Sequence, residues 1–182
     1  MRIHGMTILQ LILQVAALYA PAMAANMAPV VARRYNLFSR LNKPIDFGLQ
    51  WRGERIFGAH KTIRGFVVGV ISGAIVGAVL SLIIDTHPYD YFSRAILYGA
   101  IVGFGALVGD SVKSFFKRRV GIKPGTLWVP FDQIDFAIGA TLAAMFFIRI
   151  DFFVAACAII FIGCASYVVS IVGVALHMKK NL

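Results

Sequence analysis

The sequence predicts an all-α integral membrane protein with five transmembrane helices. Its 182 residues are 59% hydrophobic and only 14% charged, a composition typical of membrane proteins rather than of soluble ones. Polar segments separate apolar runs close to the ~20 residues that one membrane helix needs. The length fits one domain. We therefore expect a single transmembrane domain over residues 1–182, with spans at about 7–32, 66–84, 93–109, 133–149 and 152–177.

The first apolar run has two interpretations. A basic start, an apolar middle and the small residues 22–24 are typical of a cleavable secretory signal. The run nevertheless continues to Arg33-Arg34 and is long enough to cross a bilayer. We favour a retained helix, because its removal would leave a strongly basic loop outside the cell. Pro21 and Pro29 lie inside this helix, so we expect it to kink or break near its end.

Glycine recurs at every fourth position along the start of the second span, at Gly65, Gly69, Gly73 and Gly77. This spacing places the glycines on one helix face, where they allow another helix to approach closely. We interpret this face as a packing surface rather than as a ligand site. The third span is also rich in glycine and runs directly into Gly109 and Asp110, and a tight turn at Arg149 and Asp151 separates the last two spans.

Lys and Arg are distributed unequally, which predicts the orientation in the membrane. Fifteen of the eighteen lie in residues 33–64, 110–135 and 179–182, which five spans place on one side. By the positive-inside tendency that side is cytoplasmic, with the N-terminus outside and the C-terminus cytoplasmic. The net charge of +10 in so apolar a chain suits lipid head groups or a polyphosphate ligand, and we expect no nucleic-acid partner.

The segment 110–135, between the third and fourth spans, combines three of the eight acidic residues with five basic ones. If the third helix continues past Gly109, four polar side chains share one face: Asp110, Lys113, Ser114 and Lys117. Asp132 and Asp135 are one turn apart at the start of the fourth helix. Taken singly, these features are compatible with a salt-bridged helix end, and Asp132 with an N-cap.

Together, the acidic and basic residues of this segment indicate a different chemistry. Three carboxylates at one membrane edge supply the oxygen ligands that Mg²⁺ prefers. The bases can neutralise a triphosphate, as phosphoryl and nucleotidyl transfer require; they are Lys113, Lys117, Arg118, Arg119 and Lys123. The chain has no Ser-His-Asp or Cys-His arrangement and no zinc spacing.

A second segment with phosphate-binding character ends the first basic loop. Gly58 precedes Lys61-Thr62 at the start of a helix, where backbone N–H groups, an ammonium and a hydroxyl can contact phosphate. The spacing does not match a P-loop. A basic loop resting on anionic lipid explains the same residues.

The segment 110–135 resembles the signature of the membrane CTP:phosphatidate cytidylyltransferases, which is S-x-x-K-R, a later Lys and then D-R-x-D. The matching residues are Ser114-Phe-Phe-Lys117-Arg118, Lys123 and Asp132-Gln-Ile-Asp135. Gln133 replaces the Arg, Pro124 replaces an acid, and the interval before Asp132 is shorter and lacks His-Gly-Gly. With these departures, the segment is similar to the shorter form of the signature in the archaeal branch, the CDP-archaeol synthases. The five-span layout agrees, as do Asn26-Met-Ala-Pro29 and the segment 58–65.

The resemblance implies an enzyme that transfers CMP from CTP to an archaeal diether lipid phosphate, 2,3-bis-O-geranylgeranylglycerol 1-phosphate, and releases pyrophosphate. It implies that Asp110, Asp132 and Asp135 bind Mg²⁺ and that Lys113 and Lys117 complete the catalytic set. The CTP-binding residues would be Asn26, Gly58, Lys61, Thr62, Lys113, Ser114, Lys117, Arg118 and Lys123. Lys43, Asp46 and Arg52 are looser candidates.

Three alternatives stay open. They are a phosphatidate cytidylyltransferase acting on ester lipids, a CTP-dependent lipid kinase, and a non-enzymatic small transporter or lipid-binding scaffold. For the enzyme we expect CTP, a membrane lipid phosphate and the bilayer as partners. We place it in the cell (plasma) membrane as a multi-pass protein, with its active site on the cytoplasmic side. The sequence leaves the oligomeric state undetermined.

Overall fold

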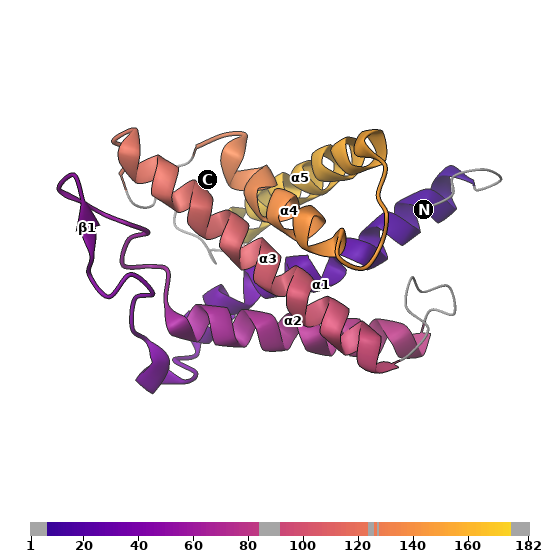
Figure 1. The fold of residues 1–182 in the computed structure, drawn as a ribbon, viewed down its shortest axis with the longest axis horizontal. Helices are drawn as coiled ribbons and strands as arrows, with labels where there is room; N and C mark the ends of the chain where they lie inside the picture. The colour runs from indigo at the N-terminus through magenta and orange to yellow at the C-terminus, as the bar shows by residue number, and fades with distance from the viewer. Residues whose placement is uncertain (1–6, 84–91, 124–125, 127, 176–182) are drawn as a thin grey trace.

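The computed structural model describes residues 7–83, 92–123, 126 and 128–175, most of which lie in five α-helices (Figure 1). The helices are α1 (Ile8–Arg34), α2 (Ile63–Ile83), α3 (Phe92–Arg119), α4 (Phe131–Ala144) and α5 (Phe152–Ala175). The loop after α1 contains a 3₁₀ turn, η1 (Ser39–Leu41), and a short antiparallel hairpin of β1 (Gln50–Trp51) and β2 (Glu54–Arg55). The predicted all-α class is confirmed.

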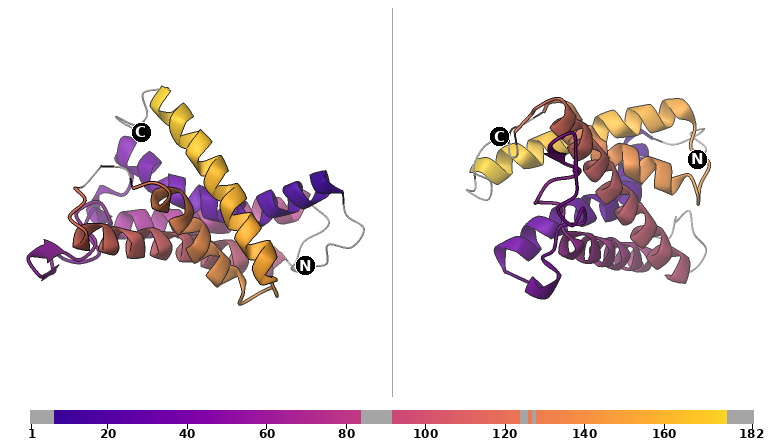
Figure 2. Two further views of the ribbon diagram at one scale, coloured as in Figure 1. Left: turned by 90° about the horizontal axis from the view of Figure 1, so that it is seen from above. Right: turned by 60° about the vertical axis from the view of Figure 1, so that its left-hand side comes forward.

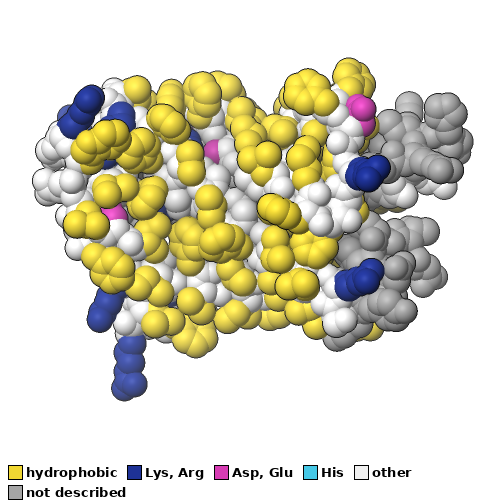
Figure 3. All heavy atoms as spheres, viewed as in Figure 1, with side chains coloured by type: hydrophobic (Ala, Val, Ile, Leu, Met, Phe, Trp, Pro, Cys, Tyr) yellow, Lys and Arg dark blue, Asp and Glu magenta, His cyan; other side chains and the backbone are white. Residues whose placement is uncertain are grey.

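Three of the described helices are long and apolar enough to cross a membrane: α1 from Ile12, α2, and α3 from Ser93. The described part of α5 contributes a shorter apolar stretch, Phe152–Val168, and α4 has 14 residues. Large apolar side chains also cover much of the outer surface (Figure 3). The chain is thus a multi-pass membrane protein, as its composition predicted.

Two helix ends differ from the expected spans. α3 continues to Arg119, ten residues past the predicted boundary at 109. That boundary was placed where charges begin, but these charges pair with one another, and the turn with a positive φ comes only at Gly121. α4 ends at Ala144 rather than near 149, because the backbone tightens there into turns at Phe146 and Phe147. Hydrophobicity predicts burial in the membrane, not the end of backbone hydrogen bonding.

The first helix does not break at its prolines. α1 is helical through Pro21 and Pro29 to Arg34. Proline cannot donate a backbone hydrogen bond, so the Ala25 carbonyl lacks its usual partner at residue 29. That carbonyl lies against Gly69 of α2, and Pro29 packs against Gly65. Tertiary packing against glycine therefore accommodates the irregular part of the helix.

α3 lies between α2 and α4, and both contacts depend on glycine (Figure 1). A β-carbon at Gly73 would collide with the Gly99 carbonyl oxygen, and one at Gly77 with the Ala95 carbonyl oxygen. On the opposite side of α3, a β-carbon at Gly105 would collide with the Gly139 carbonyl oxygen, and one at Gly139 with the Gly105 carbonyl oxygen. The predicted packing role of the glycine face of α2 is confirmed, since Gly65, Gly69, Gly73 and Gly77 are all buried.

The core lies where α1, α3, α4 and α5 meet. It includes Tyr98, Val102, Phe136 and Ile162, each at most 1% exposed. α5 runs obliquely across the bundle and packs mainly on α4 (Figure 2). This arrangement holds α3 and α4 in place while one end of each reaches the loop that follows α1.

We predict that Gly73→Ala lowers the unfolding temperature of the protein in detergent by roughly 2–10 °C, because an added methyl group would push α2 away from the α3 backbone. Thermal unfolding followed by circular dichroism measures the effect. Ile71→Ala, at an exposed position of the same helix, is the matched control and should change it little. Equal stability of the Gly73 variant and the wild type would contradict the close contact.

Candidate active site

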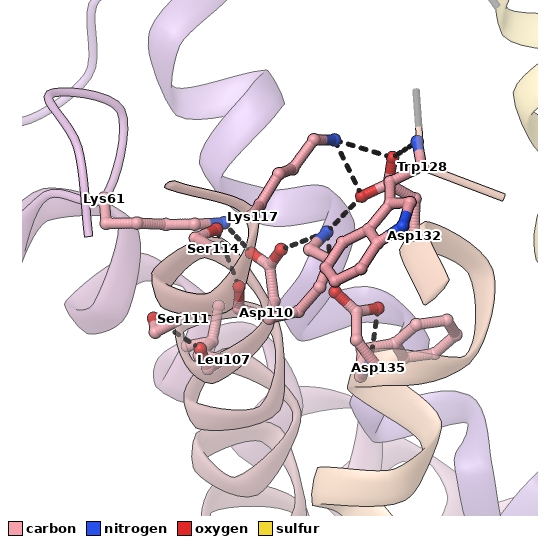
Figure 4. A network of polar contacts seen from close by, with 11 residues as sticks. Lys61, Leu107, Asp110, Ser111, Ser114, Lys117, Trp128, Asp132 and Asp135 are labelled. Atoms are coloured by element: carbon pink, nitrogen blue, oxygen red, sulfur yellow. Dashed lines mark hydrogen bonds and ion pairs between the residues drawn. The ribbon is translucent and has the colours of Figure 1, made fainter. Parts of the chain in front are cut away.

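Three carboxylates converge on one ammonium group at the loop end of α3 and α4 (Figure 4). The Lys113 Nζ atom lies 3.1 Å from Asp110 Oδ1, 2.7 Å from Asp132 Oδ1 and 2.7 Å from Asp135 Oδ2. Two further lysines complete the group. Lys117 Nζ is 2.8 Å from Asp132 Oδ2, and Lys61 forms an ion pair with Asp110 from the loop before α2.

We call these six residues the carboxylate–lysine cluster: Lys61, Asp110, Lys113, Lys117, Asp132 and Asp135. Their side chains are largely withdrawn from solvent, with exposed fractions of 6–21%. Burying a charge is costly unless it is paired, and here three positive charges balance three negative ones. The cluster is therefore electrically neutral as a unit, with each carboxylate in contact with at least one lysine.

Local structure explains how five of these residues meet. The continued α3 places Asp110, Lys113 and Lys117 on one face, as the conditional prediction required. Gly109 allows α4 to approach α3 closely, because a β-carbon at this position of α3 would collide with the Asp135 carbonyl oxygen. Asp132 is not the N-cap of α4, since the helix begins after Pro130. Its Oδ2 atom instead accepts a hydrogen bond from the Trp128 backbone N–H at 2.6 Å, which closes the turn before the helix.

A polar pocket of about 340 Å³ opens beside the cluster, bounded by α1, α2, α3, α4 and the loop before α2. Six of the residues predicted for the site line it: Asn26, Lys61, Thr62, Asp110, Lys113 and Asp132. The structure thus brings together side chains from three separate parts of the sequence, which are α1, the loop before α2 and the segment 110–135.

Other predicted residues lie nearby without lining the polar pocket. Ser114 is buried and donates a hydrogen bond to the Asp110 backbone carbonyl at 2.8 Å, so its hydroxyl is bonded within α3. Arg118 donates to the Ile122 carbonyl at 2.7 Å and lies against Gly58, whose φ is +90°. Lys123 is exposed. Lys117 and Asp135 belong to the cluster but not to the lining.

Four polar lining residues were not predicted for the site: Arg33, His60, Ser111 and Gln133. Arg33 follows Asn26 by seven residues, so both lie on one face of α1, and this spacing could have identified it. Gln133 was noted only as a departure from the related signature. It is buried, and its Oε1 atom has no hydrogen-bond partner among the described residues. A buried acceptor of this kind at a pocket is suited to a ligand donor.

Comparison with known proteins identifies the family of the chain. Residues 8–182 match the protein-family model described as CarS-like, CDP-archaeol synthase. The chain belongs to this family. Its relatives include the CDP-archaeol synthase of Methanospirillum hungatei, 46% identical over 57% of this chain and 64% of that protein. That of Pyrococcus furiosus is 40% identical over 66% of this chain and 67% of that protein. The matched region thus spans just under two thirds of the first relative's length.

A solved structure gives wider coverage. It is described as that of an intramembrane enzyme for archaeal membrane lipid biosynthesis, and it is 30% identical to this chain. The two superpose with a TM-score of 0.74 over 88% of this chain and 94% of the other. The match to the family model over residues 8–182 includes all the elements that build the polar pocket, not only the segment 110–135.

In this member of the family the loop before α2 is organised by Asp46. Its carboxylate accepts from the Gly48, Phe57 and Gly58 backbone N–H groups at 3.1, 3.2 and 3.1 Å, and from Arg55 at 2.5 Å. Burial would raise the pKa of Asp46, but these hydrogen bonds outweigh it, so the pKa is below its ordinary value. Asp46 is thus a structural residue that helps to hold Lys61 in position. Like Lys43 and Arg52, it does not line the polar pocket.

His60 is a titratable group of the polar pocket that lies in the loop before α2, outside the membrane helices. Desolvation, then the positive charges of Arg33, Lys61 and Arg118, keep its pKa below the ordinary value of histidine. The imidazole is therefore neutral at neutral pH, and the three cations that surround it make the pocket attractive to an anion.

The donor set of the cluster fits a hard divalent cation, because its three acidic side chains all direct oxygens towards one cationic group. Among the described residues, however, no group of three or more Asp, Glu, His or Cys side chains is placed to form a metal site. Oxygen ligands from another molecule would have to complete the coordination.

We predict that Asp46→Asn speeds hydrogen exchange of the Gly48, Phe57 and Gly58 amides at least tenfold near neutral pH, because hydrogen bonds to a charged acceptor are worth ~1.5–3 kcal/mol. The folded pKa is lowered, so this stabilisation is complete above the ordinary pKa of Asp and is lost as pH falls through the lowered value. Exchange measured by mass spectrometry tests this. Glu54→Gln, an exposed carboxylate of the same loop, should leave exchange unchanged.

Proposed function

We propose that this chain is a CTP-dependent lipid cytidylyltransferase. It transfers CMP from CTP to an archaeal diether lipid phosphate, 2,3-bis-O-geranylgeranylglycerol 1-phosphate, and yields a CDP-lipid and pyrophosphate. The observation that carries the proposal is the buried carboxylate–lysine cluster at the wall of a polar pocket. Membership of the CDP-archaeol synthase family supports the same reaction.

In this reaction an oxygen of the lipid phosphate attacks the α-phosphorus of CTP. A new P–O bond forms while the bond from the α-phosphorus to the oxygen that bridges to the β-phosphorus breaks, and pyrophosphate leaves. The nucleophile is already an anion, so no strong general base is needed. The tasks of the protein are therefore to align two phosphate groups and to stabilise the negative charge around them.

The polar pocket and the adjoining carboxylate–lysine cluster provide groups for both tasks. Lys61, Lys113 and Lys117 can exchange their carboxylate partners for phosphate oxygens, and Arg33 adds a further positive charge at the wall of the pocket. Asn26 and Gln133 offer amide donors and acceptors, and the Gln133 Oε1 atom still lacks a partner among the described residues. We assign the nucleotide to this pocket.

We further propose Mg²⁺ as the cofactor, held by Asp110, Asp132 and Asp135 together with phosphate oxygens. When bound, it would neutralise charge on the triphosphate. For localisation we propose the cell membrane with the polar pocket on the cytoplasmic side. The basic loop after α1 lies beside the basic end of α3 at one end of the bundle (Figure 1), and this clustering supports a cytoplasmic position for that end.

Purified protein in detergent should convert labelled CTP and the diether lipid phosphate into a lipid that carries the cytidine label, with release of pyrophosphate. Thin-layer chromatography and a pyrophosphate assay follow the two products. An ester-linked phosphatidic acid tested in parallel defines the lipid class. Release of CDP with phosphorylation of a lipid alcohol would instead identify a kinase, and an absence of cytidine-labelled lipid from every lipid acid would refute the proposal.

Asp110→Asn, Asp132→Asn and Asp135→Asn should each reduce kcat at least a hundredfold, because each removes a charge that the reaction requires at the cluster. Asp151→Asn changes an exposed acid in the turn before α5 and should retain wild-type activity. Thermal unfolding of every variant separates loss of chemistry from loss of fold. Near-normal turnover in the three cluster variants would favour a transporter or lipid-binding scaffold.

Lys113→Met should bind Mn²⁺ at least tenfold more tightly than the wild type in the absence of nucleotide. The wild-type ammonium occupies the centre of the three carboxylates and repels a second cation. Electron paramagnetic resonance titration of free Mn²⁺ measures the affinity. Lys123→Met, which removes an exposed lysine, is the matched control. Equal Mn²⁺ affinity in the Lys113 variant and the wild type would contradict the assignment of the metal ligands.

A further inference from the structure

A second cavity, of about 620 Å³, lies between α3 and α4 on the outer, apolar face of the bundle. Figure 3 shows that apolar side chains cover this face and that an acidic side chain is visible among them. The cavity is lined almost entirely by apolar and glycine residues, among them Phe104, Val108, Ile138 and Leu142. We call it the α3/α4 groove.

The α3/α4 groove meets the polar pocket at one residue. Lys113 lines both cavities, and it is the only residue that does so in the described part of the chain. Asp135 is the other charged residue of the groove, and its Oδ2 atom lies 2.7 Å from Lys113 Nζ. The apolar groove therefore passes the carboxylate–lysine cluster at Lys113, and its lining continues on the other side to Phe116, Val120 and Trp128.

The glycine contact between the two helices explains the shape of the groove. Gly105, Gly109 and Gly139 bring the backbones of α3 and α4 together and also line the groove. Large side chains stand on either side of this contact, as Phe104 and Leu142 do with exposed fractions of 51% and 60%. Small residues between two rows of large ones leave a channel that runs along the helices.

The part of the groove between Lys113 and Ile101 matches the depth of one membrane leaflet. On α3 the lining extends from Lys113 back to Ile101, twelve residues away, which is about 18 Å at ~1.5 Å per residue. Half of the ~30 Å hydrocarbon core of a bilayer is about 15 Å. A lipid chain with its phosphate at Lys113 would thus extend through one leaflet within the groove.

We infer that the α3/α4 groove binds one hydrocarbon chain of the lipid phosphate substrate, and that Lys113 is where the lipid phosphate meets the nucleotide. The inference rests on the proposed cytidylyltransferase function. The lipid enters sideways from the bilayer, while CTP enters from the aqueous side through the polar pocket. Leu142, about two turns along α4 from Asp135, and Phe146, just past the end of α4, line the part of the groove that receives the distal end of the chain.

Bulky substitutions in the groove test this assignment. Ile138→Trp should raise KM for the lipid phosphate at least tenfold while KM for CTP stays within twofold, because the indole would fill the channel without reaching the polar pocket. Leu142→Trp should raise the ratio of kcat/KM for short-chain lipid phosphates to kcat/KM for long-chain ones by at least tenfold. Ile75→Trp, at a 56% exposed position on the outer face of α2, is the matched control and should alter neither constant. An unchanged lipid KM in Ile138→Trp would overturn the inference.

A second experiment does not depend on turnover. A diether lipid phosphate with a photoreactive diazirine in one chain should label peptides of α3 and α4 rather than α2, and excess unlabelled lipid phosphate should compete. Competition by phosphatidylcholine as effective as by the lipid phosphate would show that the groove holds bulk membrane lipid, which overturns the inference. Selective labelling in a protein that makes no CDP-lipid would support the groove and refute only the proposed reaction.

Discussion

The approach of α3 to α4 at Gly109 is the constraint on which the site depends. No side chain larger than hydrogen fits between this residue and the Asp135 carbonyl. The contact brings Asp135 to the level of Lys113, one turn beyond Gly109 on α3, and so lets two helices share one ammonium. The same contact creates the α3/α4 groove on the outer face. One close backbone contact therefore positions the charged cluster and joins it to the apolar surface.

Neutrality allows such a dense set of charges to exist at the edge of a membrane. An isolated carboxylate or ammonium in this position would be strongly destabilising, whereas three lysines and three aspartates compensate each other at distances of about 3 Å. Lys61 completes the balance from a loop, and Asp46 holds that loop through four hydrogen bonds. The position of Lys61 in the cluster thus depends on the buried carboxylate of Asp46, which lies outside the polar pocket.

Much of this architecture could be predicted from the sequence, and the exceptions have physical causes. Composition and apolar runs predicted the membrane helices, and the four-residue glycine spacing predicted the packing of α2. The ends of α3 and α4 differ from the expected span boundaries, because hydropathy does not report neutralised charge or backbone turns. Arg33 was missed although its spacing from Asn26 could have identified it. Gln133 was missed because a residue's presence in a pocket depends on which helices face each other. The α3/α4 groove needs two helices at a defined distance, which no single segment encodes.

The neutral cluster also constrains the order in which ligands enter the site. A lone divalent cation would meet carboxylates that already have ammonium partners, and a lone triphosphate would compete with carboxylates for the lysines. A cation and a triphosphate that enter together provide partners for both sets, so no charge is left buried and unpaired during the exchange. Lys113 contacts all three acids and lines both cavities, so it is the residue whose partners change most in this exchange. In the proposed reaction its release from the carboxylates would free an ammonium for the lipid phosphate at the point where the groove meets the pocket, and would so couple nucleotide binding to capture of the lipid.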